Sequence, residues 1–450
     1  MCDCLFYGIL KMVHAFKIND YFYLFDVESN NLFRVDELAV CIVKGENLEK
    51  FSLQEIDEAK RELEELKNNG LLFTKSSNDL DIEKSRYIKS MCLHLSHDCN
   101  LRCKYCFADE GAYHGKREHM PLDTALASID FLIAHSGNIK NLEVDFFGGE
   151  PLMNFEVLKK TVSYAKEQAI KHGKIFKFTT TTNGILLDKQ VSDYLNEEMD
   201  NVVLSLDGRK DVHDRARPTA NGKGSFDIIL DKFKYFRHIR KDKSYFLRGT
   251  FTKDNLDFCE DVLFMADNFD QVSVEPVVLP EDHKMAISES DLPILFQQYE
   301  KLAIEYVKRR KLPDKWFGFF HFNIDLQNGP CIKKRLMGCG AGCSYCAVTP
   351  DGNVYPCHQF AGEKDFVLGN VFDKRLDDQK RNVFFGSTLN TKPTCKTCWA
   401  KFQCSGGCAA NAIHFCGDIN KPYALACELL KKRLECALYI YDMEHNFTQN

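Results

Sequence analysis

Three cysteines in one short stretch are the residues of this sequence best suited to carry out chemistry. Cys99, Cys103 and Cys106 follow one another at the spacing C-x3-C-x2-C. Three thiolates can hold three irons of a 4Fe–4S cluster and leave the fourth iron open to a small molecule. Tyr105, between the last two cysteines, would place an aromatic ring beside that molecule. Three buried structural cysteines, or three ligands of a zinc site, are alternative interpretations.

A second group of cysteines lies in the last third of the chain. Cys339 is followed by the segment Gly352-x4-Cys357, and Cys395 begins a set with the spacing C-x2-C-x5-C-x3-C. That set comprises Cys395, Cys398, Cys404 and Cys408, and Cys427 follows it. Because the 20 cysteines gather in close sets, they indicate metal ligation in a reducing interior and not a disulfide framework. Two C-x2-C pairs forming a Cys4 zinc knuckle are the competing interpretation.

Composition narrows the class of protein. With 450 residues and 44% hydrophobic side chains, the chain can form two or three domains with sizeable cores. A net charge of -6 gives no indication of nucleic-acid binding. The apolar run Leu5 to Leu10 is too short for a secretory signal and lacks a basic lead-in, and no run is long enough to cross a membrane. We therefore expect a cytoplasmic protein with no nucleic-acid or membrane partner.

The first 86 residues predict a small α/β module without a catalytic set of residues. Two aromatic and β-branched runs, Tyr21 to Val27 and Leu32 to Val35, flank a polar turn and predict a hairpin. The elements expected after it are a short helix begun by Asp36, a longer helix from the capping box Ser52 to Glu55 as far as Gly70, a strand at residues 71–73 and a polar linker at residues 76–84.

From residue 90 the sequence alternates strand and helix patterns, which indicates βα units on a parallel sheet. Six repeats predict a partial (β/α)6 barrel, in which functional residues gather at the carboxyl ends of the strands. The predicted strands are residues 91–95, 142–147, 176–182, 202–206, 245–251 and 272–277. The predicted helices begin after Pro121 and lie near residues 155–172, 188–196, 226–239 and 258–267.

The cysteine stretch from Cys99 to Cys106, with its filling Asn-Leu-Arg and Lys-Tyr, resembles the signature of the radical S-adenosylmethionine (SAM) superfamily. This resemblance implies that the amino and carboxyl groups of SAM chelate the open iron. The motif Gly148-Gly149-Glu150-Pro151 is similar to the superfamily's GGE motif, which meets the SAM amino group. The SAM-binding residues implied by the resemblance are Tyr105, Gly149, Glu150, Ser205, Arg217 and Val277. For Ser205 and Arg217, a strand-end cap and a surface ion pair are the alternatives.

The later cysteines closely resemble the SPASM extension of peptide-modifying radical SAM enzymes, which carries two auxiliary 4Fe–4S clusters. By that pattern Cys339, Cys357 and Cys408 hold auxiliary cluster I. The resemblance assigns Cys395, Cys398, Cys404 and Cys427 to auxiliary cluster II. We favour an open iron in cluster I that binds a substrate thiolate, although Cys343 and Cys346 lie where some relatives place another ligand. The cofactors expected are SAM and three 4Fe–4S clusters.

The whole pattern resembles the SCIFF-peptide maturases, thioether-forming enzymes of the sactipeptide and ranthipeptide kind. The resemblance is carried by Cys92 to Cys99 (Cys-Leu-His-Leu-Ser-His-Asp-Cys), Ala347 to Gly352 (Ala-Val-Thr-Pro-Asp-Gly) and Cys398 to Lys401 (Cys-Trp-Ala-Lys). It implies a winged-helix-like leader-peptide recognition element at residues 1–86, a radical SAM partial barrel at residues 87–315 and a SPASM domain at residues 316–450.

The resemblance also implies a mechanism and partners. A 5′-deoxyadenosyl radical would remove a hydrogen atom from a cysteine-rich precursor peptide bound through its leader, and a cysteine sulfur would bond to that carbon. An electron donor such as flavodoxin or ferredoxin would reduce the first cluster. No catalytic side chain is assigned. A formylglycine-forming anaerobic sulfatase maturase and a non-catalytic, zinc-bound peptide scaffold are the alternatives.

Overall fold

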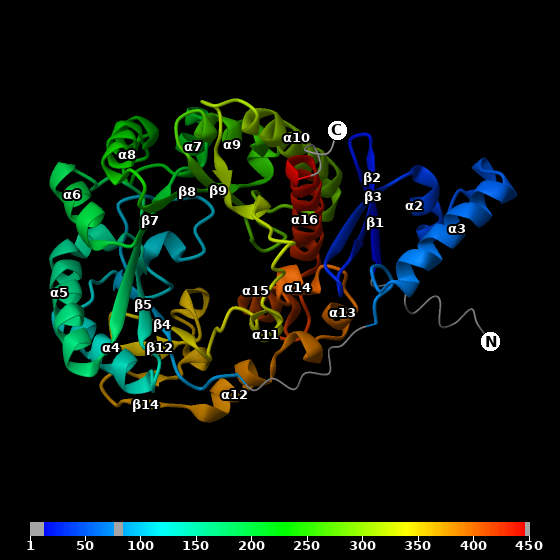
Figure 1. Ribbon diagram of the computed structural model, residues 1–450. Coiled ribbons are helices and arrows are strands. Elements are labelled where there is room, and N and C mark those ends of the chain that lie inside the picture. Colours follow the sequence, from blue (N-terminus) through cyan, green and yellow to red (C-terminus); the bar gives the residue numbers. More distant parts are fainter. Residues whose placement is uncertain (1–12, 76–83, 446–450) are drawn as a thin grey trace.

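The computed structural model describes residues 13–75 and 84–445 of the chain (Figure 1). The predictions for the apolar run Leu5 to Leu10 and for most of the linker at residues 76–84 therefore lie outside the described residues. Within the described part, two sheets and the helices packed on them position every candidate site residue.

The larger sheet is built around six parallel strands that follow chain order, β4 to β9. They span Ser90–Ser96, Asn141–Gly148, Ile175–Thr182, Asn201–Ser205, Ser244–Phe251 and Gln271–Pro276. All six predicted strands are confirmed. Their order and parallel pairing bring all six carboxyl ends to one rim of a curved, open barrel (Figure 1).

Helices cover the outer face of this sheet (Figure 1). In chain order they are α4 (Leu122–His135), α5 (Phe155–His172), α6 (Lys189–Glu198), α7 (Lys210–Ala216), α8 (Phe226–Arg240), α9 (Phe258–Ala266) and α10 (Leu292–Arg310). The strand residues that face the helices are buried and apolar, as Leu142, Val144 and Phe146 of β5 are. Side chains alternate along a strand, so Asp145 and Phe147 face the barrel lumen. The five predicted helices are confirmed as α4, α5, α6, α8 and α9, whereas α7 was not predicted.

The C-terminal region extends the barrel sheet instead of forming a separate layer. Strand β11 (Tyr345–Val348) pairs in parallel with β4, so the sheet continues from the first barrel strand. The strands beyond β11 are β12 (Asn353–Tyr355), β13 (Gly369–Asn370) and β14 (Arg375–Leu376), and β10 (Gly318–Phe319) lies at the opposite edge. The helices are α11 (Ile332–Met337), α12 (Asp378–Gly386), α13 (Pro393–Lys396), α14 (Lys401–Cys404), α15 (Ala409–Cys416) and α16 (Ala424–His445).

The N-terminal module is an antiparallel sheet of three strands with two helices on one face. Its elements are β1 (Val13–Ile18), β2 (Tyr21–Asp26), β3 (Asn31–Val35), α2 (Glu37–Lys44) and α3 (Leu53–Asn68). The predicted hairpin is confirmed as β2 and β3, and β1 was not predicted. Asp36 caps α2 by accepting from the backbone of Ala39, and the Ser52–Glu55 capping box is present.

The predicted strand at residues 71–73 is wrong. These residues form bends, and Phe73 has a left-handed backbone with φ of 54°. The backbone N–H groups of Leu71 and Leu72 both donate to Leu66 O at the end of α3, and Thr74 N donates to the Asp26 carboxylate. The segment buries Leu72 and Phe73 in the core of the module, so apolar burial produced its strand-like pattern.

The other face of the three-stranded sheet packs on the C-terminal helix α16 (Figure 1). Tyr23 Oη donates to Asp442 Oδ2 at 2.8 Å, and Arg34 Nε donates to the same oxygen at 2.9 Å. The imidazole of His14 stacks on the Trp399 indole with ring centroids 3.7 Å apart. The N-terminal module is therefore fixed to the region that holds the last set of cysteines.

Helix α10 and helix α16 are the long helices of the C-terminal half, but neither has the apolar character of a membrane span. No helix of residues 13–75 and 84–445 is long and apolar enough to cross a membrane.

A buried ion pair offers a test of this docking. Lys401 Nζ contacts Glu28 Oε1, and both side chains are only 3% exposed. We expect Lys401→Ala to lower the free energy of unfolding by about 3–5 kcal/mol, because it removes the cation facing a buried carboxylate. The matched double variant Lys401→Met with Glu28→Gln should lose much less. Urea denaturation measures both, and equally small losses would show that the pair does not stabilise the docking.

Candidate functional site

The loop after β4 brings the first three cysteines together at the rim of the barrel. Burial raises the pKa of Cys99 to about 12 and that of Cys103 to about 11, and the Cys106 thiol nearby adds to both shifts. Backbone N–H groups of Arg102 and Lys104 donate to Pro218 O and Ala216 O, which holds the loop against the end of α7. These are half-buried, neighbouring thiols that would release protons on binding metal.

Backbone approaches the cysteine loop very closely at Gly149. A Cβ atom at this position would lie 2.2 Å from Asp98 O, so only glycine fits. Gly149 N donates to Ser96 O, and Glu150 N donates to Asp98 O. The predicted GGE segment therefore lies directly against the residue that precedes Cys99.

Glu150 is a buried carboxylate at this rim, where β5 and β6 end. It accepts from Thr182 Oγ1 at 2.8 Å, from Asn183 N at 2.8 Å and from Leu152 N at 3.1 Å. Burial raises its pKa to about 7, against the lowering by these hydrogen bonds and by the charge of Arg217. A carboxylate held among neutral donors can accept a ligand ammonium group.

Tyr105 and Arg217 meet at a residue to which the sequence assigned no role. Tyr105 Oη donates to Asp207 Oδ2 at 2.7 Å, and Arg217 NH1 donates to Tyr105 Oη at 2.8 Å. Asp207 is fully buried and also lies 3.5 Å from the Arg217 guanidinium. Arg217 Nε is buried without a hydrogen-bond partner, which leaves one edge of the guanidinium for a carboxylate ligand.

The remaining predicted SAM residues lie at the same rim. Ser205 is the last residue of β7 and pairs with Arg248 of β8. Val277 follows β9, is 7% exposed and donates its N–H to Phe251 O. Asn183, which follows β6 and was not predicted as a site residue, donates from Nδ2 to the Cys99 thiol at 3.5 Å. A hydrogen bond to a cluster sulfur is a known means of tuning its potential.

The second set of thiols lies beside β11 and β12. Burial raises the pKa of Cys357 to about 12, and the thiols of Cys408 and Cys339 add to the shift. Cys343 lies near Cys339 and the ammonium of Lys84, and burial raises its pKa to about 11. Cys346 belongs to the main hydrophobic core instead. The structure therefore brings together the three predicted ligands and adds Cys343 to their surroundings.

The third set lies where α13, α14 and α16 meet. Burial raises the pKa of Cys427 to about 12, and the thiols of Cys404, Cys395 and Cys398 raise it further. The predicted four-cysteine grouping is thus brought together. Trp399, next to Cys398, is the residue on which His14 stacks, so this set lies directly under the N-terminal module.

The thiols of each set are neighbours, but they do not converge on one point. In the described ranges, no three His, Cys, Asp or Glu side chains are arranged to hold a single metal ion. Each thiolate of a four-iron cluster binds a different iron, so a cluster does not require the thiols of a set to share one focus.

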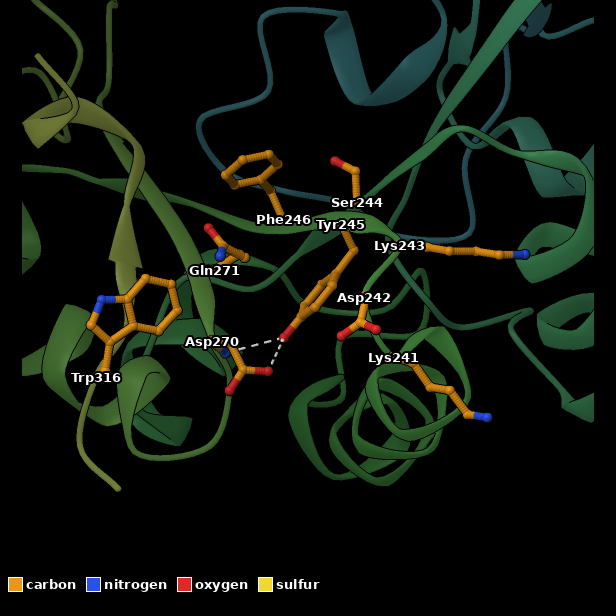
Figure 2. A pocket seen from close by; sticks show the side chains of 9 residues that line it. All are labelled: Lys241, Asp242, Lys243, Ser244, Tyr245, Phe246, Asp270, Gln271 and Trp316. Atoms are coloured by element: carbon orange, nitrogen blue, oxygen red, sulfur yellow. Dashed lines mark hydrogen bonds between the residues drawn. The ribbon is translucent and has the colours of Figure 1, made fainter. Parts of the chain in front are cut away.

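A separate hollow lies far from these residues. It has a volume of about 510 Å³ and is lined by Ser244 and Gln271, at the amino ends of β8 and β9, and by Trp316, which precedes β10 (Figure 2). Tyr245 and Asp270 hydrogen bond to each other beside it. Because the candidate SAM residues lie at the carboxyl ends of the strands, this hollow is not part of that site.

Comparison with known proteins identifies two domains in the chain. Residues 93–263 match the radical SAM superfamily, and residues 339–399 match the SPASM iron–sulfur cluster-binding domain. The chain therefore contains a radical SAM domain and a SPASM iron–sulfur cluster-binding domain. The first match includes the cysteine loop and the GGE segment, and the second includes Cys339, Cys357, Cys395 and Cys398.

Relatives with named activities are distant. The radical SAM cyclopropyl synthase TigE of Paramaledivibacter caminithermalis is 24% identical, over 81% of this chain and 78% of its own. The cysteine-type anaerobic sulfatase-maturating enzyme of Clostridium novyi is also 24% identical, over 70% of this chain and 86% of its own.

Solved structures share the fold. The sulfatase-maturating enzyme anSMEcpe with bound AdoMet has a TM-score of 0.63 at 18% identity, covering 80% of this chain and 96% of its own. Streptococcus suis SuiB bound to its precursor peptide SuiA has a TM-score of 0.53 at 19% identity, covering 90% and 95%. The predicted fold class is confirmed: an α/β radical SAM domain with a C-terminal SPASM domain.

Glu150→Gln tests the role of the buried carboxylate. In the metal-free protein, the pKa of Glu150 is raised from 4.5 to about 7, so the folded state holds this proton more tightly than the unfolded state. The wild-type protein therefore loses stability as the pH rises through this range. The glutamine of the variant does not titrate. The difference in unfolding free energy, variant minus wild type, should therefore rise by up to about 3 kcal/mol as the pH increases from about 4 to about 8. Chemical denaturation at each pH measures the difference.

The same variant should bind SAM more weakly in the iron-loaded protein. Losing the charge that accepts the ligand ammonium should lower the affinity by about tenfold or more. Equilibrium dialysis measures the affinity. Unchanged SAM binding at neutral pH would contradict the assignment of Glu150 to the cofactor.

Proposed function

We propose that this radical SAM enzyme installs a thioether between a cysteine sulfur and a carbon of a ribosomally made precursor peptide. The observation that carries the proposal is the place of β4 between two sets of thiols. The loop after β4 holds Cys99, Cys103 and Cys106, whereas the backbone at its start, Lys89 and Ser90, donates to Ser344 O beside Cys343. One strand therefore separates a site for hydrogen abstraction from a site for sulfur chemistry.

The residues at the rim fit the cofactors of this reaction. Cys99, Cys103 and Cys106 would hold the first cluster, Glu150 would accept the SAM ammonium, and Arg217 would hold its carboxylate. Ser205, Val277, Gly149 and Tyr105 complete the cofactor-binding set. When bound, SAM and the three clusters would supply a 5′-deoxyadenosyl radical and an electron acceptor. A flavodoxin or ferredoxin would deliver the initiating electron.

The N-terminal module supplies a place for a leader peptide. In the described residues, β3 pairs with β2 alone, so its other edge is open to a further strand. An extended peptide can add to such an edge through main-chain hydrogen bonds. Packing on α16 holds this module in place beside the barrel. A peptide whose leader is bound on β3 would therefore reach the lumen only if the segment after the leader is long enough to span the gap. This supports a cysteine-rich precursor peptide as the partner.

Formylglycine formation on a sulfatase is the second candidate, and two observations favour it. Sulfatase-maturating enzymes are among the relatives at 24% identity. Cys343 also lies beside Cys339, where a fourth thiolate would close auxiliary cluster I and leave no iron for a substrate sulfur. The two candidates differ in whether the substrate is recognised through a leader.

The test uses the iron-loaded enzyme, SAM, a strong reductant and a cysteine-containing precursor peptide. We expect deoxyadenosine and a peptide that has lost two hydrogens, with fragmentation placing the new bond at a cysteine sulfur. Cys99→Ala should abolish both products, while Cys416→Ala, outside the three sets, should keep them. A peptide aldehyde in place of a thioether would contradict the proposal and favour formylglycine formation.

Hydrogen exchange tests leader recognition without disturbing the fold. Deleting residues 1–86 would expose Trp399 and the part of α16 that they cover, so the loss of activity would have two causes. We expect the leader alone to slow amide exchange in Asn31 to Val35 and not in the covered core strand β2. Exchange that is unchanged at β3 would rule out leader binding at this edge.

A further inference from the structure

The lumen between the two thiol sets contains an acid group that the cofactor site does not use. Asp145 lies in the middle of β5 and pairs with Cys92 of β4, so both side chains face the lumen. Asp145 Oδ1 is the one buried carboxylate oxygen in residues 13–75 and 84–445 that lacks a hydrogen-bond partner. A buried acceptor without a donor costs free energy, which indicates a group kept for a ligand.

The other carboxylates of the lumen and its rim are already occupied. Glu150 accepts three hydrogen bonds, and Asp207 accepts from Tyr105 and from Thr250 N. Glu275 is paired with Arg433 at 2.9 Å. Among these carboxylates, Asp145 is therefore the one with an oxygen, Oδ1, that can still accept a hydrogen bond from a substrate.

Asp145 lies between the two sites of the proposed reaction. The charge of Asp145 raises the pKa of Tyr113, and the thiols of Cys99 and Cys106 in the first set raise the same pKa. The charge of Asp145 also raises the pKa of Cys92 and of Tyr345, and the Cys357 thiol of the second set raises both of these pKa values. Gly148 at the rim lies three positions after Asp145 along β5, a rise of about 10 Å. A peptide spanning the lumen would pass this carboxylate.

We propose that Asp145 is the proton acceptor of the reaction, an inference that rests on the proposed function. Forming a C–S bond from a C–H and an S–H group removes one hydrogen atom, one proton and one electron from the peptide. The hydrogen atom goes to the 5′-deoxyadenosyl radical, the electron goes to an oxidised iron–sulfur cluster, and the thiol proton goes to the free Oδ1 of Asp145. The C–S bond forms as the S–H and C–H bonds are lost.

The charges around Asp145 suit this role. Burial raises its pKa to about 7, and the Arg248 guanidinium of β8, which faces it across the lumen, lowers it. Titratable groups near Asp145 on the lumen side are Cys92 of β4, Tyr113 of the rim loop and Tyr345 of β11. His94 of β4 lies against Tyr113, and His358 lies against Tyr345. Burial raises the pKa of the thiol and of the two phenols and lowers the pKa of both imidazoles, so all five groups stay neutral near pH 7 and the imidazoles are weaker bases than the carboxylate.

Asp145→Asn keeps the side-chain shape and removes the base. The measured quantity is the ratio of oxidised peptide, lighter by two hydrogens, to deoxyadenosine in the iron-loaded enzyme. We expect deoxyadenosine formation and deuterium transfer from labelled peptide to continue, while the ratio falls by about a hundredfold or more. In wild type the ratio should also fall as the pH drops below about 7, where Asp145 becomes protonated.

Glu143→Gln is the matched control, because Glu143 lies on the same strand and face at its solvent-exposed start, paired with Lys89. Its ratio should equal that of wild type. A wild-type ratio in Asp145→Asn, or a pH-independent ratio in wild type, would overturn the acceptor role and leave the proposed function standing. If the wild-type product has lost no hydrogens, the proposed function fails, and the acceptor role fails with it because no proton is released.

Discussion

The parallel pairing of β4 with β5 on one side and β11 on the other is the constraint on which this structure depends. Because β11 joins the barrel sheet, the C-terminal cysteines are fixed in register with the strand that leads to the first cysteine loop. Neither set can move relative to the other without breaking the sheet. The lumen face of β4 and β5, which carries Cys92 and Asp145, is the surface between the two cysteine sets. The length of these strands sets the distance between the sets.

Burial is the common electrostatic property of the site. It raises the pKa of Cys99, Cys357, Cys427 and Glu150, so these groups of the metal-free site favour their neutral forms. Binding iron, sulfide and a zwitterionic ligand would replace protons by charges that compensate one another. The N-terminal module contributes through packing, since His14 covers Trp399 beside Cys398. Metal binding, cofactor binding and the docking of the module are therefore parts of one arrangement.

Sequence patterns predicted the six barrel strands because helix-facing residues such as Leu142 and Val144 alternate with lumen-facing ones. Spacing predicted the first cysteine set, and the resemblance to the SPASM extension predicted which of the later thiols lie together. The partners of Asp207 and Asn183 and the surroundings of Asp145 were not predictable, because they depend on which strands become neighbours. The same limit applies to β11, whose short run gives no indication that it pairs with β4. Residues 71–73 misled the prediction because burial in the module core produces the same apolar pattern as a strand.

Iron and acid-labile sulfide per chain, measured on anaerobically reconstituted protein, test the central claim most directly. The account predicts about twelve irons, four for each of three clusters. Substituting alanine for Cys99, Cys103 and Cys106 together should remove about four of them and leave the other two clusters intact. Zinc in place of iron, or an iron content that does not respond to any of the three cysteine sets, would contradict it.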